Sequence, residues 1–416
     1  MEGQVTRRAL LRATGGTLAV GLGSGIVTGG APARDGFVQV NVGYSDVRGR
    51  AAARRAARSV DREFAFDALT LTVPQQAVAG LSKNPHVRYV EENGVWHAIP
   101  NRPGAAKPPG GCEPWPECKD GDDGSDGGGG DPPSQTLPWG IDRVDAEVAH
   151  ANGDTGAGSH VAIIDSGIDA NHPDLPNVGA GRAFVNCRGG NCLTSWDDDN
   201  DHGTHCAGIA AAADNTEGVV GVAPGATLHA VKVLDKRGSG SWSDVAAGIQ
   251  YVADQGWDVG SLSLGGSFDS QLVRDAVAYA VNAGVLLVAA AGNDGPCSGC
   301  VGYPAAYDGV MAVGSTTQTD TLSYFSSTGS EVEIAAPGSA IYSTVPGGSY
   351  DSFSGTSMAC PHVSGAGAQL MAGGLSAEQA RAALTSTAED IGLAGSEGGA
   401  GLLDVAAALG LDSSNN

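Results

Sequence analysis

Long apolar runs are scarce in this 416-residue chain, and so are lysine, methionine and aromatic residues. Only 5 residues are Lys and 4 are Met, and aromatic residues make up 5%. The formal net charge is −23, which argues against nucleic acid as a partner because an acidic surface repels phosphates. No segment after residue 33 is apolar enough to span a bilayer. Hydrophobic residues still make up 41%, enough for a buried core.

The charge is unevenly divided along the chain. Residues 1–110 carry a net charge of +6, whereas residues 111–416 carry −29. A basic N-terminal part and an acidic body attract each other, so we expect the first to dock on the second. Self-repulsion within the body predicts that stability and activity depend on salt.

Residues 1–33 have the features of a signal peptide. Arg7 and Arg8 precede a weakly apolar, Gly-rich stretch that ends in the small-x-small cleavage site Ala31-Pro32-Ala33. The paired arginines are typical of a twin-arginine signal. A membrane anchor is the alternative, but six glycines interrupt the run, so we expect no stable anchor. The protein is therefore predicted to be secreted and extracellular.

Eight cysteines fit an exported protein. Three pairs lie close in sequence and could each close a loop: Cys112/Cys118, Cys187/Cys192 and Cys297/Cys300. Zinc binding is the alternative, disfavoured because the pairs lie far apart in Gly-rich loops. Cys206 and Cys360 remain, either as two thiols or as a disulfide.

The pattern divides the exported chain into three parts. Residues 34–99 predict a small α+β unit, with strands at 37–42, within 64–73 and at 88–92, and helices at 48–60 and 74–81. Residues 100–133 are rich in Gly, Pro and Asp and predict a linker. Residues 134–416 alternate short apolar runs with helical stretches. This alternation predicts an α/β fold, a mostly parallel sheet with helices on both faces.

Three segments of the body indicate chemistry. Asp165 ends an apolar run, His202 opens an Ala-rich helical stretch in Asp201-His202-Gly203-Thr204-His205, and Ser357 lies in Gly355-Thr356-Ser357-Met358-Ala359. A serine hydroxyl needs a base to take its proton, and the base needs a carboxylate to orient it. A helix beginning at Ser357 adds partial positive charge where an oxyanion forms. Pro361 is expected in the first turn of that helix, where proline is tolerated.

In these three motifs, and in their order and spacing, the chain resembles the subtilisin-like serine proteases. The resemblance covers about residues 135–411, and residues 37–99 resemble the family's inhibitory, ferredoxin-like propeptide. The acidic composition and the twin arginines look most like secreted proteases of halophilic archaea. The resemblance implies that Asp165 orients the base His202, that Ser357 is the nucleophile, and that the Asn293 side chain donates to the oxyanion.

The resemblance also implies where a polypeptide substrate binds. Two extended segments would hold its backbone between them as an added strand. Small residues would form its main side-chain pocket, beside Asp294, which could help accept a basic side chain. The implied substrate-binding residues are Gly238, Ser239, Gly240, Ser263, Leu264, Gly265, Ala290, Gly292 and Gly302.

Calcium is the cofactor that the resemblance implies. Its ligands would be side-chain oxygens of Gln135, Asp174 and Asn215 and the carbonyls of Glu217 and Val219. Residues 197–199 could form a second site and Glu333 a weak one, but solvated surface acid is the favoured interpretation for both. His205 and His362 are expected to be structural. Because the family usually has small residues at positions 206 and 360, the resemblance favours two buried thiols there, Cys206 and Cys360, over a disulfide.

Other functions leave other signatures. A zinc protease would show His-Glu-x-x-His, whereas His202 and His205 have Gly-Thr between them. An esterase would show Gly-x-Ser-x-Gly, but the second glycine is missing after Ser357. A catalytically inactive binding protein would not need an intact Asp, His and Ser together with Asn293.

The resemblance implies a monomeric zymogen that is inhibited by its own propeptide and processes itself. The mature chain would begin near Ile99 or near Ser134. The linker spans about 30 Å as a flexible coil, so Gln135 is expected to reach the calcium loop before the chain is cut.

Overall fold

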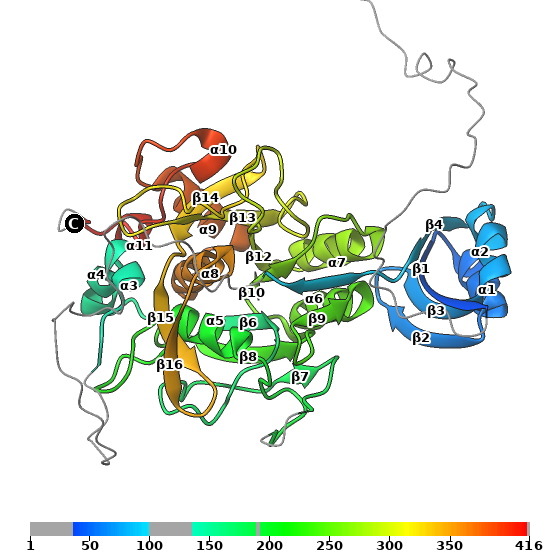
Figure 1. The fold of residues 1–416 in the computed structure, drawn as a ribbon, viewed down its shortest axis with the longest axis horizontal. Coiled ribbons are helices and arrows are strands. Elements are labelled where there is room, and N and C mark those ends of the chain that lie inside the picture. Colours follow the sequence, from blue (N-terminus) through cyan, green and yellow to red (C-terminus); the bar gives the residue numbers. More distant parts are fainter. Residues whose placement is uncertain (1–35, 100–134, 189–191, 414–416) are drawn as a thin grey trace, which may run out of the picture.

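The computed structural model describes residues 36–99, 135–188 and 192–413. A seven-stranded parallel sheet forms the centre of the larger part, as the alternating pattern predicts (Figure 1). Across the sheet the order is β14 (Val332–Pro337), β13 (Val310–Thr316), β12 (Leu286–Ala290), β10 (Val259–Leu262), β6 (His160–Asp165), β8 (Thr227–Lys232) and β7 (Arg182–Ala183).

Helices cover both faces of this sheet. Successive residues of β6 point to opposite faces: Val161 and Ile163 pack in one core cluster, Ala162 and Ile164 in another. The two long helices on the second face are α6 (Trp242–Gln255) and α7 (Gln271–Asn282). Against the first lie α3 (Trp139–Arg143), α4 (Ala146–Asn152), α5 (His202–Ala211), α8 (Thr356–Ala372), α9 (Ala377–Ser386) and α11 (Val405–Ala408).

Smaller elements complete the body. A hairpin of β15 (Ile341–Val345) and β16 (Ser349–Phe353) packs against α5, and α10 (Gly395–Gly398) lies beside β14. No helix within the described ranges is long and apolar enough to cross a membrane.

Residues 36–92 form an α+β unit at one side of the body (Figure 1). Its antiparallel sheet has the order β2 (Ser59–Phe64), β3 (Ala68–Pro74), β1 (Phe37–Tyr44) and β4 (Val87–Glu92). With α1 (Val47–Ala56) and α2 (Gln75–Ser82), the chain order is the βαββαβ order of ferredoxin-like folds. This topology was expected from the resemblance.

The predicted helix over 48–60 was too long. The helix ends at Ala56, and Ala57 is extended at φ −80° and ψ 139°. Ser59 already belongs to β2, which pairs with β3. Pairing of β2 with β3 therefore ends the helix, although the preceding Ala- and Arg-rich segment favours helix formation.

Candidate active site

The end of β6 and the start of α5 bring Asp165 and His202 together. Both side chains are buried, and His202 Nδ1 lies 2.8 Å from Asp165 Oδ1. Residue 203 has to be glycine, because a Cβ there would overlap the Gly167 carbonyl oxygen. Since a carboxylate can only accept, the proton of the imidazole lies on Nδ1.

Two opposing effects set the pKa of His202. Burial disfavours the charged imidazolium and lowers the pKa, whereas the carboxylate of Asp165 raises it by its charge and its hydrogen bond. The negative charge of Asp198 raises it further. The net result is a pKa above the ordinary value of a histidine.

Ser357 is the second residue of α8 and is fully buried. Its Oγ lies within donating distance of the carbonyl oxygens of Ile99 and Ser263, at 3.2 Å each. Among the described residues, His202 Nε2 has no hydrogen-bond partner. Ser357 and His202 therefore share no hydrogen bond in this structure, in which the Ile99 carbonyl lies at Ser357 Oγ. Hydrogen bonds between catalytic groups are often long or poorly aligned until substrate reacts.

Pro361 lies deeper in α8 than predicted. The helix begins at Thr356, so proline falls in its second turn rather than the first. Proline has no N–H to donate to the carbonyl of Ser357. That carbonyl instead accepts from Ser263 Oγ at 2.9 Å and Cys206 Sγ at 3.5 Å. The missing helical bond is thus replaced by side chains beneath the site.

Asn293 lies against the first turn of α8. Its Oδ1 accepts from the N–H and the hydroxyl of Thr356, at 2.9 Å each. A Cβ on Gly355 would lie 2.9 Å from Nδ2, so this position has no room for a side chain. The amide group is thereby held beside the helix N-terminus, where partial positive charge gathers.

An extended segment of the chain itself fills the predicted substrate cleft. β5 (Val95–Ala98) pairs antiparallel with β9 (Ser239–Ser241) on one side and β11 (Leu264–Gly265) on the other. Ala98 N–H donates to Gly238 O at 2.7 Å, and Ile99 N–H to Ser263 O at 3.3 Å. The two segments predicted to hold a substrate backbone thus lie on either side of residues 95–98 of the chain itself.

The predicted pocket residues also meet. A cavity of about 200 Å³ beside Ile99 is lined by Ala290, Gly292 and Gly302, together with Asp294. Gly292 has φ +121°, and a Cβ there would lie 2.7 Å from Ser327 Oγ. A larger residue at this position would strain the backbone and narrow the pocket.

Charged groups join residues 36–99 to the body. Arg62 pairs with Asp244 at 2.8 Å, and Arg88 with Asp275 at 2.9 Å. The Glu91 carboxylate accepts from the first backbone N–H groups of α7, at 2.9 and 3.1 Å. A carboxylate is favoured there because it satisfies unpaired N–H groups and faces the positive end of the helix dipole.

The five predicted calcium ligands lie close together. Asp174 accepts from Asn215 Nδ2 at 2.8 Å and from Val219 N–H at 2.7 Å, and Glu217 N–H donates to Asn215 Oδ1 at 2.6 Å. Gln135 reaches the same loop, where its Nε2 donates to Ala213 O at 2.9 Å.

This donor set suits calcium, because it consists of a carboxylate, side-chain amides and carbonyls, all hard oxygen ligands. Turning the Asn215 and Gln135 amides over would present their oxygens to an ion. The Ala213 carbonyl would be a further oxygen ligand. The sequence does not indicate it, because a backbone oxygen leaves no side-chain signal.

The structure forms two of the three predicted cysteine pairs, Cys187–Cys192 and Cys297–Cys300. Cys206 and Cys360 are buried free thiols, as favoured. Cys112 and Cys118 lie outside the described residues, as do the predicted signal peptide and linker.

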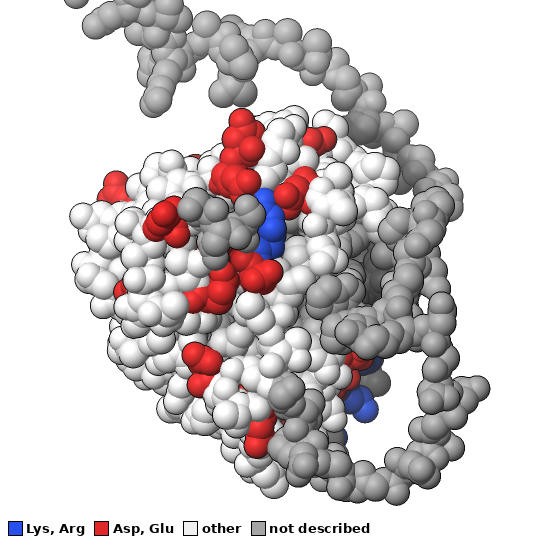
Figure 2. Space-filling model, turned by 90° about the vertical axis from the view of Figure 1, so that its left-hand side faces the viewer, with Lys and Arg blue, Asp and Glu red and all other residues white. Residues whose placement is uncertain are grey.

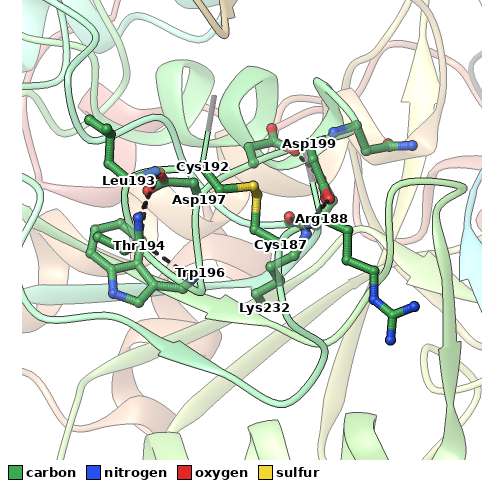
Figure 3. Close-up of a disulfide and its surroundings, with 12 residues drawn as sticks. Cys187, Arg188, Cys192, Leu193, Thr194, Trp196, Asp197, Asp199 and Lys232 are labelled. Atoms are coloured by element: carbon green, nitrogen blue, oxygen red, sulfur yellow. Dashed lines mark hydrogen bonds and ion pairs between the residues drawn. A yellow bond between two sulfur atoms is a disulfide. The ribbon is translucent and has the colours of Figure 1, made fainter. Parts of the chain in front are cut away.

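Residues 197–199 are not solvated surface acid, contrary to the prediction. Asp197 and Asp198 are 8% and 9% exposed, and the Asp199 carboxylate pairs with the buried Lys232 at 2.6 Å. Figure 3 shows this pair beside the Cys187–Cys192 disulfide. Glu333 is paired too, with Arg381.

His205 and His362 lie in structural surroundings. His205 stacks on Phe353 with ring centroids 4.3 Å apart, and His362 Nδ1 lies 2.8 Å from Met358 O. Burial lowers the pKa of His205 to about 3 and that of His362 to about 4. Both rings therefore stay neutral.

The parallel sheet and the Asp–His pair beside a helix-borne serine define an α/β serine hydrolase. The subtilase family model matches residues 156–402, more than half of the chain. The chain therefore belongs to the subtilase family, and it is a serine endopeptidase.

Named relatives support this assignment. Subtilisin E of Bacillus subtilis is 38% identical over 339 residues, which are 81% of this chain and 79% of the relative. Thermitase of Thermoactinomyces vulgaris is 48% identical over 263 residues, 63% of this chain and 91% of the relative. Subtilisin DY of Bacillus licheniformis is 46% identical over 263 residues, 62% and 94%.

Proposed function

We propose that the chain is the precursor of a secreted, monomeric, calcium-stabilised peptidase whose nucleophile is Ser357. His202 takes the hydroxyl proton as Ser357 attacks the peptide carbonyl, and Asp165 stabilises the imidazolium. Asn293 and the Ser357 N–H stabilise the oxyanion. The observation that carries the proposal is the 2.8 Å Asp165–His202 contact beside an extended segment whose last carbonyl touches Ser357 Oγ.

Residues 34–99 act as the inhibitory propeptide. Support comes from β5, which fills the substrate cleft, and from the Arg62–Asp244 and Arg88–Asp275 pairs that join basic propeptide to acidic body. Release then requires a cut between Ile99 and Gln135, made by Ser357 itself.

The proposal is tested by expressing the full chain and its Ser357→Ala variant in a protease-free host with molar salt. The wild type should lose its propeptide and hydrolyse unstructured polypeptides. The alanine variant should stay full length and inactive. Processing of the alanine variant at the same rate would rule out Ser357 as the nucleophile of maturation.

Calcium is proposed to bind the loop of Asn215 and Glu217 with Asp174, and to do so before the chain is cut. Gln135 lies at the loop while Ile99 is still at Ser357, which supports this order. Calorimetric titration of uncut Ser357→Ala protein should give tighter calcium binding than the same protein with Gln135→Ala added. Equal affinities would refute an early role for Gln135.

The acidic body and the paired arginines favour a halophilic archaeal source. On this view the export signal lies in residues 1–33, and the linker in residues 100–133 lets the folded body bind calcium before export.

A further inference from the structure

A buried carboxylate, that of Asp198, lies between the loop after β6 and the first turn of α5. Its Oδ1 accepts from Ser166 Oγ at 2.8 Å and from the N–H groups of Asn200 and Asp201 at 2.9 and 3.2 Å. Its Oδ2 accepts from the N–H and the hydroxyl of Thr204 at 2.9 and 2.6 Å. Burial raises the pKa of Asp198 above that of an ordinary aspartate. The hydrogen bonds oppose this shift and favour the ionised carboxylate, because all five partners donate.

These contacts join the two segments that carry Asp165 and His202. Ser166 follows Asp165 and donates its N–H to Asp165 Oδ1 at 2.7 Å. Ser166 Oγ also accepts from the N–H of Gly203, the residue after His202, at 2.9 Å. Asp198 therefore links Ser166, which follows Asp165, to Asp201, which precedes His202, in one hydrogen-bonded unit.

No neighbouring charge among the described residues cancels the effect of the Asp198 carboxylate on the pKa of His202. On α5, burial keeps the thiol of Cys206 protonated by raising its pKa, and it keeps the ring of His205 neutral by lowering its pKa. On β8, Lys232 is neutralised by Asp199 and also donates to the Ser166 carbonyl. Among the described residues, the charges that raise the pKa of His202 are thus those of the Asp165 and Asp198 carboxylates.

The neighbouring Asp197 has nearly the same burial but different partners. Its carboxylate accepts from the backbone N–H of Leu193 and from the N–H and hydroxyl of Thr194, the last two at 2.9 and 2.7 Å. Leu193 and Thr194 directly follow Cys192, and Figure 3 shows them beside the Cys187–Cys192 disulfide. Asp197 therefore stabilises its own loop, and it provides a matched control.

We propose that Asp198 is a positioning residue of this peptidase: it fixes Asp165 and His202 relative to each other and stabilises the imidazolium that forms during catalysis. The proposal rests on the assignment of Asp165, His202 and Ser357 as the catalytic groups.

The test compares kcat/KM against pH for processed wild type, Asp198→Asn and Asp197→Asn. Asp198→Asn should lower the plateau of kcat/KM roughly 10- to 100-fold through misplacement of the triad. Loss of the negative charge at residue 198 should destabilise the His202 imidazolium and lower the pKa of His202. The acid limb should therefore move to lower pH by roughly half a unit or more. Asp197→Asn should keep the wild-type midpoint.

An acid limb that stays in place in Asp198→Asn, whatever the loss of rate, would overturn the electrostatic part of the role. An unchanged plateau would overturn the positioning part. If Asp198→Asn does not mature, NMR titration of His202 in its uncut Ser357→Ala form measures the same shift against uncut Ser357→Ala alone. Peptide hydrolysis that survives Ser357→Ala in the wild-type background would instead refute the proposed triad itself.

Discussion

If His202 is the general base, as proposed, its pKa should set how the activity responds to acid. Burial lowers its pKa, but the charges of Asp165 and Asp198 and the hydrogen bond that His202 donates to Asp165 raise it above the ordinary value of about 6.5. The imidazole acts as a base only when neutral, so kcat/KM should fall as pH drops through a midpoint above 6.5. Initial rates on a small peptide from pH 5 to 9 measure this midpoint, with activity after return to pH 8 as the stability control. A midpoint below 6.5 would contradict the assignment.

Asn293 offers a test of the oxyanion site. Removing one such donor typically costs about 2.7–4 kcal/mol of transition-state stabilisation, or 10²–10³ in kcat. Asn293→Ala should therefore lower kcat by that factor while KM changes little. Steady-state kinetics on one peptide check both values. A large rise in KM at unchanged kcat would assign Asn293 to ground-state binding instead.

The sequence alone predicts some residues of the candidate site and misses others. The positions of Asp165, His202 and Ser357 follow from motifs, because each motif combines a functional residue with the glycines and alanines that its packing requires. Asp198 was misjudged because an acidic run looks the same whether it is solvated or buried. Its burial depends on donors from Ser166 and Thr204, which are brought to it only by the fold.

The end of the proposed propeptide, residues 34–99, bears on where the first cut would fall. Ile99 O is at Ser357 Oγ, yet residue 100 is proline, whose ring nitrogen carries no hydrogen. In any bond to proline a ring carbon takes the place of that hydrogen, which hinders protonation of the leaving nitrogen by a general acid. The bond after Ile99 should therefore resist cleavage, and the mature chain should begin closer to Ser134.

Pro100→Ala tests this expectation. The variant should gain a cut after Ile99 and should process faster than wild type, whereas Pro103→Ala should behave as wild type. N-terminal sequencing and intact mass identify the cut over a time course. A wild-type mature chain that begins at Pro100 would show that the bond is cleaved without difficulty.

The elements themselves were largely predictable. The strands of the body were anticipated from short apolar runs, since strands buried on both faces need apolar side chains on both. The helix predicted over residues 48–60 is too long, because Ser59 and Val60 belong to β2. They form a strand only through pairing with β3. Long-range pairing of this kind leaves no local signal.

Acidic side chains outnumber basic ones in the molecule, with 46 Asp and Glu against 23 Lys and Arg. Figure 2, which views the side where α3, α4 and α11 lie, shows many Asp and Glu but few Lys and Arg. The net charge of −29 on residues 111–416 should destabilise the body in dilute buffer by self-repulsion. Near 1 M salt the Debye length falls to about 3 Å and most of this repulsion is screened.

Activity and thermal stability should therefore rise together with salt up to molar concentration. Peptide hydrolysis and the unfolding temperature, each measured from 0.1 to 3 M NaCl with calcium held constant, test this. Full activity retained for hours in dilute, calcium-containing buffer would show that the charge carries no such cost.

The central claim is that Ser357, activated by His202, cuts peptide bonds. Reaction with a serine-directed covalent inhibitor, followed by peptide mapping in a mass spectrometer, tests it most directly. We expect one adduct, on Ser357, formed in step with the loss of peptide hydrolysis and absent from His202→Ala. An adduct on another residue, or hydrolysis that persists when Ser357 is fully modified, would contradict the account.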